Sequence, residues 1–234
     1  MQYADPTANK KRMCNLYRQN LSAADMKLIA ESGSLSLDET SRGQNVEPGY
    51  VGADSDGPVL SVEGGQLTLR YRRWGFPPVR SGARPITNIR NLDSSWWKGA
   101  NATFLKESAF RCLIQFSSFA EWSADEGKNA WFEVEADVAC FAGVWRPWRG
   151  ERLMKVEGKK RRERREVEIE LFAFLTTEPC ETVAKVHPKA MPVILTNAQE
   201  RQAWLRGGSE SFELQRPLDD RLIRRMSDYS LQRD

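Results

Sequence analysis

Alternation of apolar and polar residues is strongest in the middle of the chain, and it predicts β-strands there. "EVEIELF" at residues 166–172 alternates acidic with apolar side chains, as a half-exposed strand does. Residues 58–76 form two alternating runs around Gly64-Gly65, which predicts a β-hairpin. Four further segments are rich in β-branched and aromatic residues: 111–122, 129–136, 138–148 and 167–178. We therefore expect a mainly antiparallel sheet.

Helical signals are fewer and lie toward the two ends of the chain. A short helix is predicted over residues 22–31, with Ser22 as its N-cap. A second helix is predicted over residues 196–205, which open with the capping-box pattern of Thr196 and Gln199. These two segments are the clearest helices that the pattern supplies.

The remaining segments lack a clear period. Residues 33–57 and 77–101 are rich in Gly, Ser, Asp or Pro and are predicted to be loops, and residues 101–109 add a helical turn or two. The basic stretch 151–165 lies between two strands and reads as a hairpin tip or insertion. The polar tail after Arg216 is expected to be peripheral. The fold class that results is a single α+β domain without internal repeats.

Composition places the chain among ordinary soluble proteins. It has 234 residues, of which 40% are hydrophobic and 29% charged, and this length is ample for one well-packed core. No apolar run approaches the roughly 18–20 residues that a membrane-spanning helix needs, and the first residues lack the apolar stretch of a signal peptide. We expect a cytoplasmic, nucleoid-associated monomer that does not enter membranes.

Four cysteines, Cys14, Cys112, Cys140 and Cys180, lie far apart and form no CxxC pair. This spacing argues against a disulfide framework or a zinc site, and no metal or cofactor is expected. Cys112 and Cys140 lie in apolar strand-like segments and are expected to be small buried residues. Cys14 differs because it directly follows Met13 near the start of the chain.

Charge is distributed unevenly, although the net charge is only +3. Residues 31–67 hold seven acids and one Arg, and residues 158–166 form a strongly basic patch. Residues 70–90 contain no acid and six arginines: Arg70, Arg72, Arg73, Arg80, Arg84 and Arg90. Because phosphate binding depends on local positive potential, this clustering indicates a nucleic-acid partner. The stretch 151–165 could extend such a surface or be a solvated loop, and we favour the loop.

Several residues could carry chemistry. His187 is the only histidine and could act as a general acid or base near neutral pH, or be structural. Glu121 ends an apolar strand-like run; if buried, it could move protons, and if not, it faces solvent. Asn88 could orient a substrate, or serve a turn.

Arg90 and two aromatics complete the candidates. Arg90 could clamp a phosphate, or simply be solvated. Trp74 and Phe76 alternate with Arg residues and could stack on unpaired bases, or be core aromatics at a strand end. Together with Cys14, these residues suggest a cysteine-centred reaction on nucleic acid.

The order of several unusual strings resembles one family. "MCNLY", "NVEPGY", "RRWGFPP", "TNIRN", "RCLIQFSSFAEW", "FAGVW", "FLTTEP" and "HPKAMPVIL" follow one another along the chain. Over Met13 to Pro217 the chain is similar to the SRAP family, the SOS response-associated peptidases or abasic-site processing proteins. The resemblance implies a compact α+β domain with a twisted, barrel-like core. It also implies a protein that binds single-stranded DNA containing an abasic site.

The resemblance assigns roles to individual residues. Cys14, once N-terminal, would close a thiazolidine with the sugar aldehyde, because its α-amine and thiol together form a five-membered ring. Asn88 would orient the amine or the sugar, Glu121 would act as acid and base, and His187 would be catalytic. The resemblance implies DNA contacts by Arg90, Lys189, Trp74 and Phe76, and the arginine cluster adds Arg73 and Arg84.

Two departures from the family bear on that chemistry. Asn15-Leu16 stands where the family usually has Gly-Arg. Residues 1–13 must also be removed, because a blocked Cys14 has no free amine. Either translation starts at Met13, which we favour, or the chain cuts itself before Cys14. We therefore expect an extension over 1–13, a domain over 14–217 and a tail over 218–234.

Two other functions stay open on the sequence. If the N-terminus is not cleaved, the chain could bind single-stranded nucleic acid without crosslinking. It could also be a general cysteine peptidase that uses Cys14 and His187 on other proteins.

Overall fold

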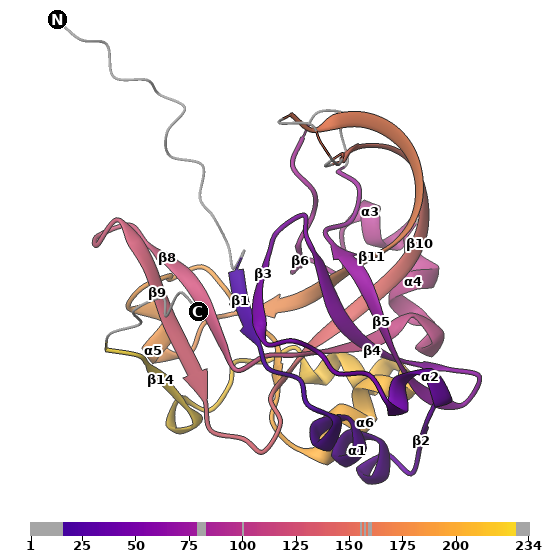
Figure 1. Cartoon of the computed structure of the whole chain (residues 1–234). Helices are drawn as coiled ribbons and strands as arrows, with labels where there is room; N and C mark the ends of the chain where they lie inside the picture. The colour runs from indigo at the N-terminus through magenta and orange to yellow at the C-terminus, as the bar shows by residue number, and fades with distance from the viewer. Residues whose placement is uncertain are drawn as a thin grey trace, which may run out of the picture.

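Five long strands form a closed barrel at the centre of the molecule (Figure 1). The computed structural model describes residues 16–78, 83–99, 101–154, 156, 158 and 161–227. The barrel strands are β4 (Asp56–Glu63), β5 (Gln66–Trp74), β7 (Arg111–Gln115), β10 (Cys140–Met154) and β11 (Glu163–Thr177). Their order is β11-β10-β7-β4-β5, and parallel pairing of β5 with β11 closes the ring. The α+β class with a barrel-like core is thus confirmed.

A second, five-stranded sheet lies beside the barrel in the order β14-β9-β8-β1-β3. Its strands are β1 (Leu16–Gln19), β3 (Gly49–Gly52), β8 (Ser118–Ser123), β9 (Lys128–Val134) and β14 (Ile223–Arg225). The last strand corrects the expectation of a peripheral tail after Arg216. Ile223 is buried and pairs with Val134 of β9, because its apolar side chain completes the core beneath this sheet.

Short elements occupy the segments predicted to be loops. The remaining strands are β2 (Ser36–Leu37), β6 (Asn88–Ile89), β12 (Met191–Pro192) and β13 (Ile194–Leu195). The helices are α1 (Ala23–Ser32), α2 (Glu39–Arg42), α3 (Ser95–Lys98), α4 (Ala102–Lys106), α5 (Glu181–Ala184) and α6 (Ala198–Arg206), with 3-10 turns at Ser108–Phe110, Ser209–Leu214 and Asp220–Leu222. Strands of two residues show no period of their own, so the sequence pattern could not predict them.

Both predicted helices are present, with one difference in capping. Ser22 and Asp25 form a capping box on α1, in which the Ser22 hydroxyl accepts from the Asp25 amide. On α6 the cap is Asn197 rather than Thr196, and its side chain accepts from the Glu200 amide at 2.9 Å. Thr196 instead donates its amide to the Glu200 carboxylate at 2.8 Å, which moves the predicted capping pattern by one residue.

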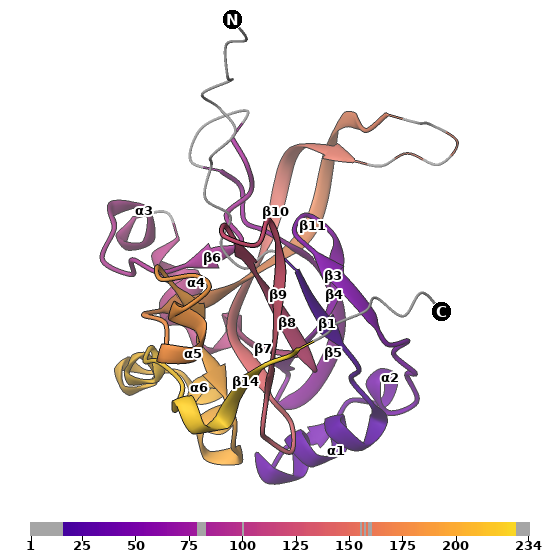
Figure 2. The same ribbon diagram turned by 90° about the vertical axis from the view of Figure 1, so that its left-hand side faces the viewer.

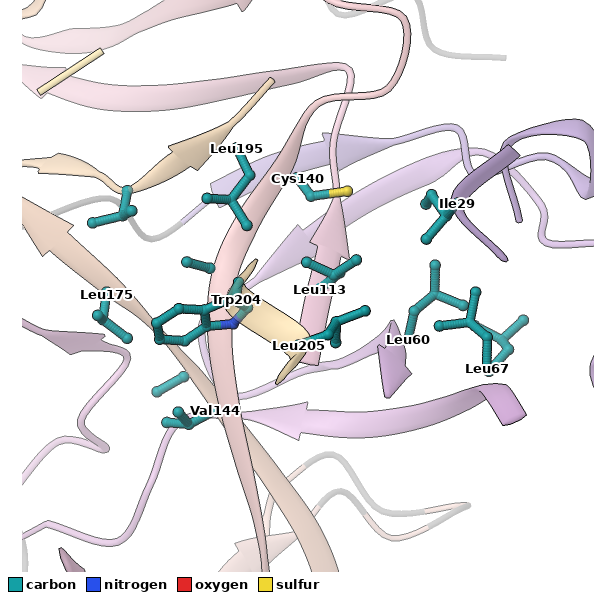
Figure 3. Close-up of a cluster of buried hydrophobic side chains, with 14 of the residues drawn as sticks. Ile29, Leu60, Leu67, Leu113, Cys140, Val144, Leu175, Leu195, Trp204 and Leu205 are labelled. Carbon is teal, nitrogen blue, oxygen red and sulfur yellow. The ribbon is translucent and has the colours of Figure 1, made fainter. Parts of the chain in front are cut away.

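The core consists of two apolar clusters. One joins the barrel to α1 and α6, and Trp204 of α6 lies among Leu113, Val144 and Leu205 in it (Figure 3). The Trp204 indole N–H donates to the carbonyls of Cys112 and Gly143, both at 3.0 Å. The second cluster is rich in aromatic side chains and lies between the barrel and the five-stranded sheet. Ile89 of β6 belongs to the first cluster and Phe119 of β8 to the second, so both clusters anchor strands that carry the candidate site.

Strands β10 and β11 are longer than the barrel requires. They pair antiparallel from Gly143 and Phe174 out to Met154 and Glu163, and their outer halves project from the body as a two-stranded ribbon (Figure 2). The hairpin expected around the basic stretch 151–165 is confirmed. Among the described residues, no helix is long and apolar enough to span a membrane.

Candidate functional site

Three buried polar side chains from separate elements form the candidate site. Glu121 on β8 is 1% exposed, Asn88 on β6 is 6% exposed, and His187, in the turn between α5 and β12, is 7% exposed. Burying polar groups is costly unless they are paired, so we expect each of these side chains to have polar neighbours. The alternative of a solvent-facing Glu121 carboxylate is therefore excluded.

Glu121 and His187 face one another. His187 Nδ1 lies 3.7 Å from Glu121 Oε2 and 3.0 Å from the carbonyl oxygen of Ala190. Because a carbonyl oxygen can only accept, the hydrogen on the neutral ring belongs on Nδ1, which leaves Nε2 as the basic nitrogen. A carboxylate beside an imidazole in a dry site can stabilise positive charge that develops on the ring during proton transfer.

The local backbone holds His187 in place. The His187 amide donates to the carbonyl of Val183 at 2.8 Å, as a continuation of α5. Pro188 then follows, and the chain turns so that the ring meets Ala190. The imidazole is therefore fixed by both its backbone and its Nδ1 atom, as a proton-transfer group requires.

Asn88 is positioned by β6 and by a tryptophan of the barrel. β6 pairs in parallel with β11, with Asn88 opposite Phe174. The Trp74 indole N–H donates to the Thr87 carbonyl at 3.0 Å, and Asn88 Nδ2 donates to the Thr87 hydroxyl at 2.9 Å. The backbone of Asn88 is thus held by strand β11, and its side chain is held by Thr87.

The expectation that Trp74 and Phe76 stack on DNA is wrong for this structure. Both side chains are 0% exposed. Trp74 packs against Phe174 at 5.0 Å between ring centroids, and Phe76 packs against Trp97 at 5.7 Å. Successive residues of a strand point to opposite faces, so a neighbouring Arg does not place an aromatic ring in the same surface. The alternative, core aromatics at a strand end, is the one the structure supports.

The basic candidates differ in how accessible they are. Arg84 and Lys189 are exposed. Arg90 is partly exposed and donates to the Lys189 carbonyl and to the Glu178 carboxylate. Arg73 is largely covered, since it donates to the Asp54 carbonyl at 2.9 Å and lies 3.3 Å from Asp56. Arg90 therefore joins the Asn88 strand to the His187 turn, whereas Arg73 belongs to a separate ionic cluster.

Cys14 lies outside the described residues, but the other three cysteines can be assessed. Cys112, Cys140 and Cys180 are buried free thiols. Burial raises the pKa of the Cys112 and Cys140 thiols to about 12 and also raises the pKa of Cys180. Because the thiolate is the nucleophile, these three residues are poor candidates for covalent chemistry.

Two positioning residues were not predicted. Gln215 donates from Nε2 to the carbonyls of Arg90 at 2.9 Å and Thr176 at 2.8 Å. Glu178 pairs with Arg90. Glu178 lies in "FLTTEP", one of the strings that carry the family resemblance, so the sequence could have indicated it. Gln215 lies in a polar stretch without a recognisable motif. In the parts of the chain that the structure describes, no group of three His, Cys, Asp or Glu side chains could hold a metal ion.

Comparison with known proteins identifies a family for this chain. Residues 13–232 match the model of the family described as SOS response associated peptidase (SRAP), so the family resemblance of the sequence is confirmed. No curated protein matches the chain.

Solved structures share the fold. A protein from Bacteroides thetaiotaomicron has a TM-score of 0.61 at 22% identity, covering 89% of this chain and 90% of its own. A protein from Bordetella bronchiseptica has a TM-score of 0.62 at 15% identity, covering 91% of this chain and 98% of its own. A phage-related protein from the same organism has a TM-score of 0.58 at 16% identity, covering 92% and 95%.

Proposed function

Because the chain belongs to the SOS response associated peptidase (SRAP) family, we propose that it binds single-stranded DNA at an abasic site and crosslinks to it through Cys14. The family name associates the chain with the SOS response to DNA damage. The crosslink would shield the lesion, and the protein would act as a monomer at the nucleoid. The observation that carries this proposal is the buried Glu121–His187 pair, whose Glu121 lies within β8, next to the residue that pairs with the start of β1.

The register of β1 places its first residue close to that pair. Leu16 pairs with Ala120, and the two strands are antiparallel. Leu16 therefore lies beside the residue that precedes Glu121. Two residues of extended chain span at most about 7 Å, so Cys14 can come within reach of the Glu121 carboxylate.

The proposed reaction uses both groups of an N-terminal cysteine. The α-amine of Cys14 adds to the aldehyde carbon of the ring-opened sugar, and water leaves as the imine forms. The thiol then adds to the imine carbon, its proton passes to the nitrogen, and a five-membered thiazolidine closes. Reference pKa values of about 8 for the amine and about 8.5 for the thiol leave both partly reactive near neutral pH.

The surrounding residues would each take one part of this reaction. Glu121 would carry protons to and from the carbinolamine oxygen as water leaves. Nε2 of His187, the basic nitrogen of the fixed ring, would assist opening of the sugar. Asn88 would orient the amine or the sugar, and Arg90 with Lys189 would bind the flanking phosphates. The proposal needs no metal or cofactor.

Exposure of Cys14 requires that residues 1–13 are absent. We favour translation from Met13 followed by removal of that methionine. The other route is hydrolysis of the Met13–Cys14 bond by the chain itself, in which the Cys14 thiol, Asn88 and Glu121 take part. Such self-processing would account for the word peptidase in the family name.

The test is a denaturing gel of the full chain mixed with single-stranded DNA that carries one abasic site. With a chain that starts at Met13 we expect a band that resists SDS and heat, and we expect Cys14→Ala in that chain to abolish the band while retaining DNA affinity. A crosslink retained in Cys14→Ala contradicts the thiazolidine. The full chain is the matched comparison: a crosslink in the Met13 chain alone identifies the extension as the block, a crosslink in both supports self-hydrolysis before Cys14, and none in either contradicts the reaction.

A further inference from the structure

The ribbon of β10 and β11 carries a net positive charge larger than that of the whole chain. Residues 146–165, here called the arm, contain ten Lys or Arg and three acids, whereas the whole chain has a net charge of only +3. The rest of the chain is therefore net negative. A projecting element with this charge excess attracts phosphate-rich partners in preference to the body of the protein.

A pocket of about 310 Å³ lies at the base of the arm. One wall is the arm itself, with Trp148, Leu153 and Arg164, and the opposite wall is the loop after β5, with Pro77 and Pro85. This volume is at the small end of ordinary ligand pockets. Flat apolar walls next to guanidinium groups suit an aromatic ring that carries a phosphate.

Close packing shapes the two walls. The Trp148 ring lies directly over Gly150, where an added Cβ would be 2.6 Å from the ring. Gly75 has a φ of +123°, and a Cβ there would be 2.6 Å from Pro85. These glycines let the ring lie flat on the arm and let the proline loop approach it.

Ion pairs with Asp54 hold the arm against the body of the protein. Arg152 donates through Nε at 3.0 Å and Nη2 at 2.7 Å to one oxygen of Asp54, and through Nη1 at 3.0 Å to the Gly75 carbonyl. Arg162 pairs with the other Asp54 oxygen, and Arg73 donates to the Asp54 backbone. Arg73 Nη1 also lies 3.7 Å from the Asp54 carboxylate, so one carboxylate pairs with three guanidinium groups and fixes this side of the pocket. Arg164, on the rim, pairs with Glu151 at 3.5 Å.

From these features we propose that the arm pocket binds one nucleotide of a single strand, with its base stacked on Trp148 and its phosphate on Arg164. The arm would hold the strand beyond the nucleotides that occupy the Glu121–His187 site. This inference rests on the proposed function for the identity of the partner. Trp and Pro faces favour a base over the carboxylates of an acidic peptide, because any base presents a flat π-face.

The test measures binding apart from crosslinking. Fluorescence anisotropy with an undamaged oligo-dT of about 15 nucleotides would be compared for the parent chain, Trp148→Leu and Arg164→Glu. We expect Trp148→Leu to weaken binding about 5- to 100-fold. Arg164→Glu should make the negative slope of log K against log salt shallower by about 0.7, the value for one phosphate contact on a single strand.

Two controls keep the result interpretable. Arg224→Glu removes an exposed, ion-paired arginine of β14, far from the arm (Figure 1), and should bind like the parent chain. Thermal unfolding identifies any variant that fails to fold; Arg164 is 55% exposed in its side chain, so Arg164→Glu is expected to fold normally. Poly-glutamate, as the acidic competitor, should not displace the oligonucleotide from the arm.

The outcomes separate this inference from the proposed function. Loss of oligo-dT affinity in both arm variants, with unchanged crosslinking of an abasic tetranucleotide, supports the pocket. If crosslinking fails for every variant but the arm variants still lose affinity, only the proposed reaction is wrong. Parent-like oligo-dT binding by folded Trp148→Leu and Arg164→Glu overturns the pocket, and so does displacement by poly-glutamate.

Discussion

The Glu121–His187 site and the arm use polar groups in opposite ways. In the site, Asn88, Glu121 and His187 are each less than 8% exposed. In the arm, the side chains of Arg162 and Arg164 are more than half exposed. Exposed ion pairs contribute about 0–1 kcal/mol and weaken with salt, whereas buried groups act through fixed geometry. The site is therefore suited to chemistry, and the arm to holding a charged strand.

Glu121→Gln should have the largest effect on this comparison. The amide keeps the shape of the side chain but cannot take up a proton, and loss of general acid–base catalysis costs about 10²- to 10⁴-fold in rate. We expect crosslinking to slow by that factor at every salt concentration, with DNA affinity unchanged. The measurement is the rate of crosslink formation on denaturing gels.

Glu133→Gln on β9 is the matched control, since Glu133 is partly exposed and pairs with Arg224. It should crosslink at the parent rate. A parent rate for Glu121→Gln as well would reduce Glu121 to a structural role and remove the distinction drawn between site and arm.

Trp74→Phe tests whether the site depends on the barrel behind it. The change keeps a ring in the core but removes the hydrogen bond to the Thr87 carbonyl, beside Asn88. Loss of that bond and of part of the indole should lower the free energy of unfolding by about 1–3 kcal/mol. Crosslinking should slow while single-strand affinity stays constant.

A DNA-contacting Trp74 gives the reverse result. Affinity would then fall while the thermal midpoint stays in place, because no core group would have been lost. Chemical denaturation and anisotropy on the same preparation distinguish the two cases.

Sequence and structure agree best where a segment is long and its partner is close. The hairpin of β4 and β5 was predictable because two alternating runs flank Gly64-Gly65. Barrel closure was not, because β5 and β11 pair in parallel across a long stretch of chain. Two-residue β6 exists only because β11 offers it a partner.

The arrangement of the side chains in the site was equally hard to predict from the sequence. The pattern around Glu121 left burial or exposure open, and the position of His187 gave no hint of Glu121 as its neighbour. Only the family resemblance grouped them. The faces of Trp74 and Arg73 were ambiguous for a related reason, because strand alternation fixes that neighbours point apart but not which one points inward.

Arg90→Glu should have an intermediate effect, between those of the site and the arm. Arg90 lies beside the site but is partly exposed and pairs with Glu178. We expect about tenfold weaker binding of single-stranded DNA and a salt slope smaller by about 0.7, with the crosslinking rate at saturating DNA little changed. Anisotropy across a salt series provides the measurement.

The double variant Arg90→Glu, Glu178→Arg separates two explanations for that loss. It restores an ion pair with the charges exchanged. Recovery of affinity would show that Arg90 acts by organising the loop. Continued weakness assigns Arg90 to the phosphate, as proposed.

Cysteine labelling should show the smallest effect, since three of the four thiols are expected not to respond. Cys112 and Cys140 have their pKa raised to about 12 by burial, so both remain protonated at pH 8, where an ordinary thiol is partly ionised. A disulfide reagent at pH 8 should label about one thiol in the native chain and four after unfolding.

Cys112→Ala should crosslink at the parent rate, with only a modest drop in thermal midpoint for the lost sulfur. Rapid native labelling of a second thiol would instead show that one of the three buried cysteines is reactive.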